Sequence, residues 1–291
     1  MYNSSQILEK FNEALAAVPY PDKPAGLYEP IKYVLSLGGK RLRPVLLLLS
    51  YQLFRDDLER ALPAALGLET YHNYTLLHDD LMDRADIRRG RPTVHRVWDE
   101  NTSILSGDTM LVLAYRFMQQ CGNADVLNLF TKTALEIGEG QQYDMNFERR
   151  TDVTEPEYIE MIRLKTSVLL ACAAKTGAIL GGASDEEADL LYAYAEQVGV
   201  AFQLQDDWLD VYGDPAVFGK KIGGDILCDK KTYLLINAWV HADHGQRERL
   251  SRWIGHETEN PEEKVEAVIS IYDELGISEL CLNAIEEYFR R

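Results

Sequence analysis

The sequence predicts an all-α fold, and three observations support this class. Apolar residues recur at spacings of three and four along several long stretches, as they do on the buried face of a helix. Alternating runs of β-branched residues are almost absent, and the hairpin dipeptides Asn-Gly and Asp-Gly do not occur. The ten prolines fall mainly between the apolar stretches, where helices end.

The expected helices differ in how many of their faces are apolar. Two early segments, 45–51 and 62–77, are apolar on more than one face, which is typical of helices in the middle of a bundle. No linker or repeat divides the chain, so we expect one helical domain over residues 1–291. The longer helices are expected, in order, at residues 104–121, 125–147, 164–180 and 186–211.

Composition and charge exclude several classes of partner. The 291 residues are 46% hydrophobic and 26% charged, as in a globular protein with a large core. Thirty Lys and Arg against 47 Asp and Glu leave a net charge of −17. This excess of acid argues against nucleic acid and anionic membrane surfaces as partners, because both would be repelled over most of the protein.

The cysteines and the apolar runs of the chain bear on its cellular compartment, and we expect a cytoplasmic protein. The four cysteines are scattered and include no Cys-x-x-Cys, which argues against a disulfide framework or a thiolate zinc site. The N-terminal residues lack the basic-then-apolar order of a secretory signal. The most apolar stretch, 168–183, carries Lys175 in its middle, so we expect no membrane span.

An acidic pentapeptide occurs twice, each time at the end of an apolar helical stretch. The first cluster is Asp79-Asp80-Leu81-Met82-Asp83 and the second is Asp206-Asp207-Trp208-Leu209-Asp210. At about 100° per residue, the first and last carboxylates of each cluster share one helix face. Such charges repel one another, and Mg²⁺ held by carboxylates and substrate phosphates would compensate them. The alternative is a solvated helix end, which two copies on apolar helices disfavour.

Basic segments flank both acidic clusters. Lys40, Arg41 and Arg43 lie in one short glycine-led segment, and Arg88 and Arg89 follow the first cluster. A third group follows the second cluster and contains Lys220, Lys221, Lys230 and Lys231. Mg²⁺ with arginine and lysine side chains is the arrangement that binds a diphosphate, so recognition of a diphosphate is predicted.

The ordered motifs resemble those of the trans-isoprenyl diphosphate synthase family, which includes farnesyl and geranylgeranyl diphosphate synthases. The likeness runs from about residue 38 to 232. Its motifs are GGKRLRP at 38–44, ETYHNYTLLHDDLMDRADIRRGRPTVH at 69–95, GD at 107–108, GQQYD at 140–144, KT at 165–166, FQLQDDWLD at 202–210, and GKKIGGD with KKT at 219–232.

The resemblance implies a fold and a reaction. The fold is a single helical bundle around a deep central cavity, with the two acidic clusters facing each other across its mouth, and it usually forms a homodimer. The reaction is a Mg²⁺-dependent head-to-tail condensation of an allylic diphosphate (dimethylallyl, geranyl or farnesyl) with isopentenyl diphosphate. Three Mg²⁺ ions bound with the diphosphates are expected.

The resemblance also assigns roles to residues. Lys40, Arg43, His72 and Arg89 match the isopentenyl diphosphate site. Asp79, Asp83 and Asp206 match Mg²⁺ ligands, with Asp80, Asp207 and Asp210 in support. Arg88, Lys165, Lys220 and Lys230 match the groups that hold the allylic diphosphate, although Lys221 is an alternative to Lys220. Thr166 and Gln203 match the pair whose oxygens face the developing cation.

Aromatic bulk below the first cluster predicts a short product. On an ideal helix Thr75 and Tyr71 point down the same side as Asp79, whereas the family's usual stopper position is occupied by Tyr74. Either residue would close the cavity one to two turns below the metals, unless both are ordinary core aromatics. We expect a farnesyl or geranylgeranyl product. Geranylgeranyl is favoured because the first cluster lacks the two-residue insertion that many bacterial farnesyl enzymes of the family have.

Two other functions are weighed against this one. A class I terpene cyclase also ionises a diphosphate with a DDxxD helix, but the second DDxxD and the GGKRLRP segment have no use there. A non-catalytic partner subunit of another prenyl synthase is the other alternative. The six intact aspartates disfavour it.

Overall fold

The structure, a computed structural model, describes residues 1–214, 222–256 and 258–291. The described residues form two compact units. The first unit contains residues 1–133 and 169–192, and the second contains 134–168 and 193–291. The expectation of one domain over 1–291 stays a prediction.

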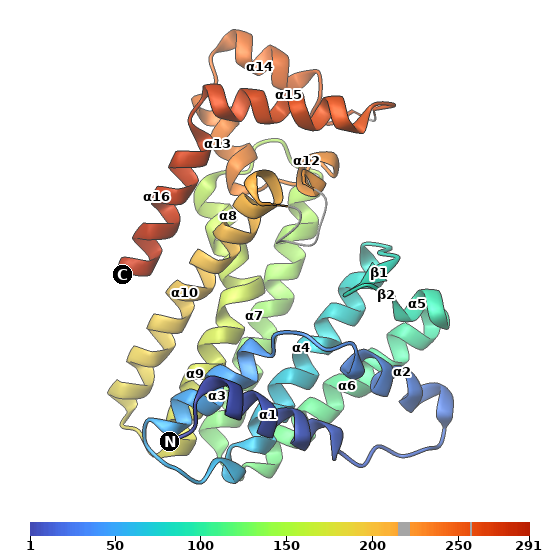
Figure 1. Ribbon diagram of the computed structural model, residues 1–291, viewed down its shortest axis with the longest axis vertical. Helices are drawn as coiled ribbons and strands as arrows, with labels where there is room; N and C mark the ends of the chain where they lie inside the picture. Colours follow the sequence, from blue (N-terminus) through green and yellow to red (C-terminus); the bar gives the residue numbers. More distant parts are fainter. Residues whose placement is uncertain (215–221, 257) are drawn as a thin grey trace. The chain divides into compact units, whose positions relative to one another are not determined.

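The first unit is built mainly from helices, as predicted. Its central helix α4 (Leu62–Met82) has an unbroken run of buried residues from Ala64 to Tyr71, so it is covered on every side. Helix α6 (Glu100–Gln120) packs along it (Figure 1). The other elements are α1 (Ser4–Ala16), α2 (Ala25–Ser36), α3 (Leu42–Gln52), η1 (Leu58–Arg60), α5 (Val94–Val97), the start of α7 (Ala124–Glu148), most of α9 (Val168–Gly181) and the start of α10 (Asp185–Tyr212).

A short hairpin follows the first acidic cluster and departs from the helical prediction. Strands β1 (Ile87–Arg88) and β2 (Arg91–Pro92) pair antiparallel, with Arg88 opposite Arg91. Arg89 and Gly90 form the turn, with φ angles of 53° and 76°. Two positive φ angles are typical of a tight hairpin turn, which usually has Asn-Gly or Asp-Gly, so the Arg-Gly turn carried no recognisable signal.

The second unit has its own apolar core. Buried residues such as Tyr158, Leu204 and Leu234 pack together with the helices that end the chain. The unit comprises the remainders of α7 and α10 together with α8 (Glu155–Ile162), η2 (Arg163–Ser167), α12 (Gly224–Leu227), α13 (Tyr233–His241), α14 (His244–Ser251), α15 (Pro261–Glu274) and α16 (Ile277–Arg290).

The predicted helix at 164–180 is part of a longer helical stretch with an irregular turn. Residues Arg163–Ser167 form a π-helical turn between α8 and α9. The whole stretch Glu155–Gly181 is long and apolar enough to cross a membrane by length and composition, with a mean hydropathy of 1.3 over its most apolar window. Of that window, 72% is buried inside the protein, so most of its apolar side chains are part of the protein core.

A buried ion pair in the first unit holds the loop that precedes α3. The side chain of Arg41, 4% exposed, donates hydrogen bonds to the carboxylate of Glu69 on α4 and to the carbonyl of Leu35 at 2.7 Å. Asn73, one turn further along α4, donates to the same carboxylate at 2.9 Å. Arg41 has a φ of 49°, so these bonds hold a backbone conformation that an arginine rarely adopts.

This buried pair yields a prediction for stability. Replacing Glu69 with Gln should lower the free energy of unfolding by about 3–5 kcal/mol, because the guanidinium of Arg41 is left buried without a countercharge. Glu286→Gln is the control, since the Arg290–Glu286 pair is largely exposed and should contribute below about 1 kcal/mol. Urea unfolding measures both, and equal losses in the two variants would contradict a special role for the buried pair.

Candidate active site

The first acidic cluster separates into one buried and two outer carboxylates. The backbone N–H of Asp83 donates to the carbonyl of Asp79 at 2.8 Å, so these residues lie one helical turn apart as predicted. Asp79 is half-buried and Asp83 is exposed. Asp80 between them is buried, with 6% of its surface exposed. The cluster therefore presents its outer carboxylates on one side of the end of α4.

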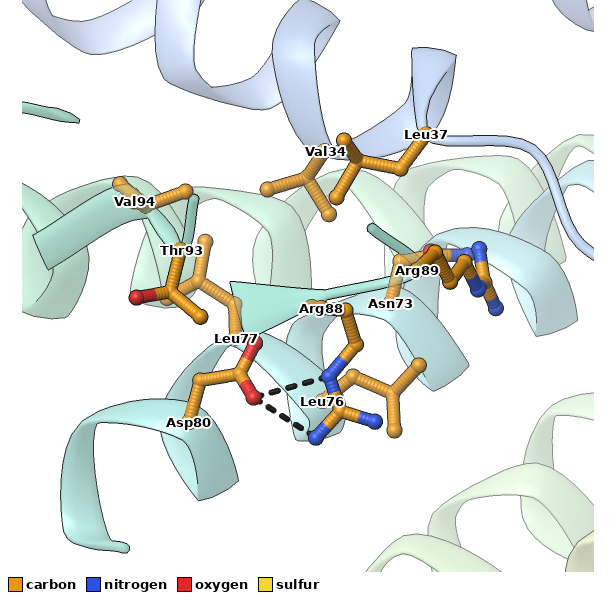
Figure 2. Close-up of a pocket in the computed structure, with 10 residues that line it drawn as sticks. All are labelled: Val34, Leu37, Asn73, Leu76, Leu77, Asp80, Arg88, Arg89, Thr93 and Val94. Atoms are coloured by element: carbon orange, nitrogen blue, oxygen red, sulfur yellow. Dashed lines mark hydrogen bonds and ion pairs between the residues drawn. The ribbon is translucent and has the colours of Figure 1, made fainter. Parts of the chain in front are cut away.

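Asp80 is bound by the arginine that follows it in the hairpin. The Nε and a terminal nitrogen of Arg88 lie 2.8 and 2.7 Å from the Oδ1 atom of Asp80, in a small pocket between α2, α4 and the hairpin (Figure 2). Burial raises the pKa of Asp80, and the positive charge of Arg88 opposes that rise. In this structure Arg88, a predicted ligand of the allylic diphosphate, orients the acidic cluster.

Three residues of the predicted isopentenyl diphosphate site lie close together in the first unit. A terminal nitrogen of Arg43 is 3.1 Å from Nε2 of His72. Arg89 donates to the carbonyl of Gly38, and its guanidinium lies against Gly39, where a Cβ atom would be 2.7 Å from Cζ of Arg89. The lack of a side chain at Gly39 thus lets the hairpin reach the loop before α3.

The same group has a strongly positive environment. Burial and the nearby charge of Arg43 lower the pKa of His72 well below its ordinary value, so its imidazole is neutral at physiological pH. Burial lowers the pKa of Arg43 to about 10, which leaves its guanidinium charged. Lys40 is exposed on the same loop. The arrangement is suited to an anion with several negative oxygens.

The second acidic cluster, on α10, has the same division. Asp207 is buried, with 2% of its surface exposed, whereas Asp206 and Asp210 are half-buried. The hydroxyl of Tyr158 on α8 donates to the carboxylate of Asp207, and the backbone N–H of Tyr233 lies 3.4 Å from it. Burial raises the pKa of Asp207 to about 7. Again the central carboxylate is held inside the protein.

Asp210 has a second function in the structure, because it anchors the segment that leads to Lys230. Its carboxylate accepts the backbone N–H of Asp225 at 2.9 Å, and its carbonyl accepts that of Gly223 at 2.7 Å. The Nζ atom of Lys230 lies 3.5 Å from the carboxylate of Asp225. Burial disfavours the charged form of Lys230, but the carboxylates of Asp225, Asp207 and Asp144 outweigh this effect and raise the pKa of Lys230.

Lys220 and its alternative Lys221 lie outside the described residues.

Two predicted residues lie in the π-helical turn. The Nζ atom of Lys165 donates to Asp144 on α7 at 2.6 Å. The hydroxyl of Thr166 donates to the side-chain oxygen of Gln203 on α10 at 3.2 Å, so the predicted pair is in contact. A Cβ atom on Gly199 of α10 would lie 2.7 Å from the Cα atom of Ser167. That glycine therefore lets α10 approach the turn, and such turns often occur at functional sites.

The predicted chain-length residues form part of an aromatic cluster in the first unit. Tyr71 is 3% exposed, and its ring centroid lies 5.5 Å from that of Tyr74 and 5.2 Å from that of Phe130. Burial raises the pKa of Tyr74, with further contributions from Asp108 and Asp79. The hydroxyl of Thr75 donates back to the carbonyl of His72 at 2.8 Å, so this group is engaged within α4.

The outer carboxylates fit a cation that arrives with its substrate. Among the residues that the structure describes, no three His, Cys, Asp or Glu side chains gather closely enough to hold a metal ion by themselves. Mg²⁺ is typically bound by one or two carboxylates and completed by substrate phosphates and water. A pair of outer aspartates at the end of a largely apolar helix provides such a donor set.

Several participating residues were not predicted from the sequence. Glu69, Asp144 and Asp225 lie in motifs but had no assigned role, and Tyr158 lies outside the motifs; each of them contacts a motif residue. The sequence contained a signal for Glu69, because a charged residue within an apolar helical stretch indicates a buried charge that needs a partner; Glu69 stands between Leu68 and Thr70 and is buried. Tyr158 carries no such signal, because an aromatic residue in an amphipathic helix is most often an ordinary core residue.

Comparison with known proteins identifies the family. The sequence model of polyprenyl synthetases matches residues 24–272. The short chain isoprenyl diphosphate synthase of Methanocaldococcus jannaschii is 41% identical over 272 residues, covering 92% of this chain and 82% of that protein. The geranylgeranyl diphosphate synthase of Methanosarcina mazei is 47% identical over 222 residues, covering 75% of this chain and 68% of that protein.

Solved structures agree with the sequence comparison. A crystal structure of a geranylgeranyl pyrophosphate synthase superposes with a TM-score of 0.94 at 45% identity, covering 99% of this chain and 90% of that one. A polyprenyl synthase from Caulobacter crescentus, complexed with calcium and isoprenyl diphosphate, has a TM-score of 0.88 at 26% identity, covering 98% and 86% of the two chains. The all-α prediction is confirmed, and the chain belongs to the polyprenyl synthetase family of prenyltransferases.

Proposed function

We propose that this prenyltransferase condenses an allylic diphosphate with isopentenyl diphosphate, head to tail, and that geranylgeranyl diphosphate is its product. The observation that carries the proposal is the shared design of the two acidic clusters. In each, a buried central aspartate is bound by an arginine or a tyrosine, and the outer aspartates are left nearer to solvent. The names of the relatives, which are short-chain and geranylgeranyl synthases, support the same reaction.

Mg²⁺ is the proposed cofactor. Asp79, Asp83 and Asp206 would hold it, supported by Asp210, and we propose three ions bound together with the diphosphates. When bound, Mg²⁺ neutralises diphosphate oxygens and stabilises the leaving group as negative charge develops on it. Asp80 and Asp207 are proposed to position the outer carboxylates, because their own oxygens are engaged within the protein.

The basic residues are proposed to bind the two diphosphates. Lys165 and Lys230 would hold the allylic diphosphate together with Arg88, and the matching position Lys220 lies outside the described residues. Both lysines already face carboxylates, Asp144 and Asp225, which direct the two amines. These cations would stabilise the diphosphate anion as the allylic carbon–oxygen bond breaks.

The second substrate is proposed to bind to the arginine group of the first unit. Lys40, Arg43 and Arg89 would contact the diphosphate of isopentenyl diphosphate, with neutral His72 as a hydrogen-bond donor. The double bond of isopentenyl diphosphate attacks the allylic cation to form a carbon–carbon bond, and a proton is then lost to the departed diphosphate. The hydroxyl and amide oxygens of Thr166 and Gln203 are dipoles that would stabilise the cation before this attack.

The aromatic cluster below the first acidic cluster is proposed to set product length. Tyr71 is buried, and its ring packs edge-on against that of Phe130. The ring of Tyr74 lies between those of Tyr71 and His78, and its centroid is 4.8 Å from that of His78. Tyr74 precedes Asp79 by five residues and Tyr71 precedes it by eight, so Tyr74 lies nearer to the end of α4 that carries the acidic cluster. We therefore propose Tyr74 as the first residue that a growing chain meets and Tyr71 as the layer behind it.

We further propose that the protein acts in the cytoplasm as a homodimer. All four cysteines are free thiols, as is usual in a reducing compartment. Helix α6 exposes Ile104, Leu105 and Val112, with 47%, 60% and 68% of their surfaces accessible. Leu105 and Val112 are seven residues apart and so lie on one helix face, which a second copy of the chain would cover.

The metal role is tested with Asp79→Asn and Asp206→Asn. Each should lower kcat by about 100- to 1000-fold, because charge stabilisation of the leaving diphosphate is weakened. Incorporation of radiolabelled isopentenyl diphosphate, measured over a Mg²⁺ titration, reports the loss. Asp189→Asn, at the exposed partner of Lys175, is the control and should be unaffected. A parent protein that elongates no allylic primer would overturn the proposed function and favour a non-catalytic partner subunit.

Product length is tested with Tyr74→Ala and Tyr71→Ala. Removing the first aromatic layer should lengthen the main product by one or more isoprene units, and the double variant should lengthen it further. Chromatography of the dephosphorylated products from geranyl and farnesyl diphosphate primers measures the distribution. Tyr33→Ala, which removes an aromatic ring packed on Trp98, serves as the control. Unchanged product length in both single variants and in the double variant would show that Tyr71 and Tyr74 do not limit the length of the product.

The dimer is tested with Val112→Glu. A charge on the exposed face of α6 should convert a dimer into a monomer in sedimentation experiments, since a buried unpaired carboxylate opposes association. Leu282→Glu on α16, where the side chain is 45% exposed, is the matched control and should leave the dimer intact. A parent protein that sediments as a monomer at micromolar concentration would contradict the proposal.

A further inference from the structure

A fully buried lysine outside the recognised motifs is attached to the loop that carries Lys230. Lys264 lies on α15 and is 1% exposed. Its Nζ atom donates to the Oδ1 atom of Asp229 at 2.7 Å. Asp229 immediately precedes Lys230, in the connection between α12 and α13. An amine from the C-terminal part of the chain thus holds the residue next to a proposed diphosphate ligand.

The loop at this point has a backbone that needs support. Asp229 has a φ of 52°, in the left-handed region that aspartate tolerates better than most residues. Its carbonyl accepts a hydrogen bond from Nζ of Lys231 at 2.9 Å. The next residue, Lys230, donates its backbone N–H to the carbonyl of Asp225 at 3.0 Å. The direction of the Lys230 side chain therefore depends on the conformation of Asp229.

The same part of α15 also contacts the other end of the segment. A Cβ atom on Gly223 would lie 2.6 Å from a methyl carbon of Val265, the residue after Lys264. Gly223 and Asp225 are in turn hydrogen-bonded to Asp210 of the second acidic cluster. Helix α15 packs against α12 accordingly (Figure 1). Two adjacent residues of α15 thus fix both ends of the segment 223–229.

We infer that Lys264 is a positioning residue, which through Asp229 sets the place of Lys230 for diphosphate binding. The inference rests on the proposed function of Lys230. Stability alone does not require the pair, because a buried ion pair is often replaced by apolar side chains without loss. An apolar residue in this place could fill the space within the core, but it could not hold the Asp229 carboxylate in one direction.

The experiment separates position from stability. Lys264→Met, Asp229→Asn and the double variant are compared with Arg249→Met, which breaks an exposed ion pair between α14 and α15. The double variant should unfold at the same urea concentration as the parent, since both charges are gone. Its KM for geranyl diphosphate should still rise about 10- to 100-fold, as when the support of a ligand-binding group is removed. Its KM for isopentenyl diphosphate should not change, and the Arg249→Met control should match the parent.

Four results would overturn the inference. A double variant with the parental KM for geranyl diphosphate would show that the pair is structural only. Equal rises in KM for both substrates would show a general disturbance of the fold. Lys230→Ala is measured beside these variants: if it raises KM for geranyl diphosphate and Lys264→Met does not, the inference fails while the proposed function stands. If Lys230→Ala changes nothing, the proposed role of Lys230 fails and the inference fails with it.

Discussion

The acidic clusters depend on the burial of one carboxylate in the middle of each. Three aspartates within five residues repel one another, and nothing in a bare helix would choose which of them faces solvent. Arg88 binds Asp80 with two nitrogens, and the Tyr158 hydroxyl donates to Asp207, so the central side chain is fixed on the inside in both clusters. The outer pair is then directed to the opposite side, where a cation and a diphosphate would bind.

Ion pairs with at least one fully buried member support loops in both units. Arg41 with Glu69 holds the loop that carries Lys40 and leads to Arg43, and Lys264 with Asp229 holds the loop that carries Lys230. Both loops contain a residue with a positive φ angle next to a side chain that is proposed to bind phosphate. Loops lack the repeating backbone hydrogen bonds of a helix, so a binding geometry on them has to be supported by side chains. The helices supply the anchoring partner in each case.

The net charge of −17 is compatible with two anionic substrates because charge is distributed unevenly. Around His72, burial acts together with the charges of Arg43, Arg89, Arg88 and Arg41 to lower the pKa of the imidazole and hold it neutral. At Lys230 the reverse holds, since surrounding carboxylates raise its pKa and keep the amine charged. Each local environment is set by a few close neighbours, and the fields of partly buried charges are screened less than those of fully exposed charges.

The sequence by itself determined the fold class, the positions of the long helices and the two acidic clusters, because helical periodicity and motif spacing are local properties of the chain. The contact of Thr166 with Gln203 and that of Arg43 with His72 joined residues that the motifs had grouped. Only the tertiary structure decided which aspartate is buried, that Arg-Gly makes a hairpin turn, and that Lys264 is a core residue. These outcomes depend on partners that are distant in the chain. Lys264 is 35 residues from Asp229, and no local sequence pattern distinguishes Lys264 from a solvent-exposed lysine.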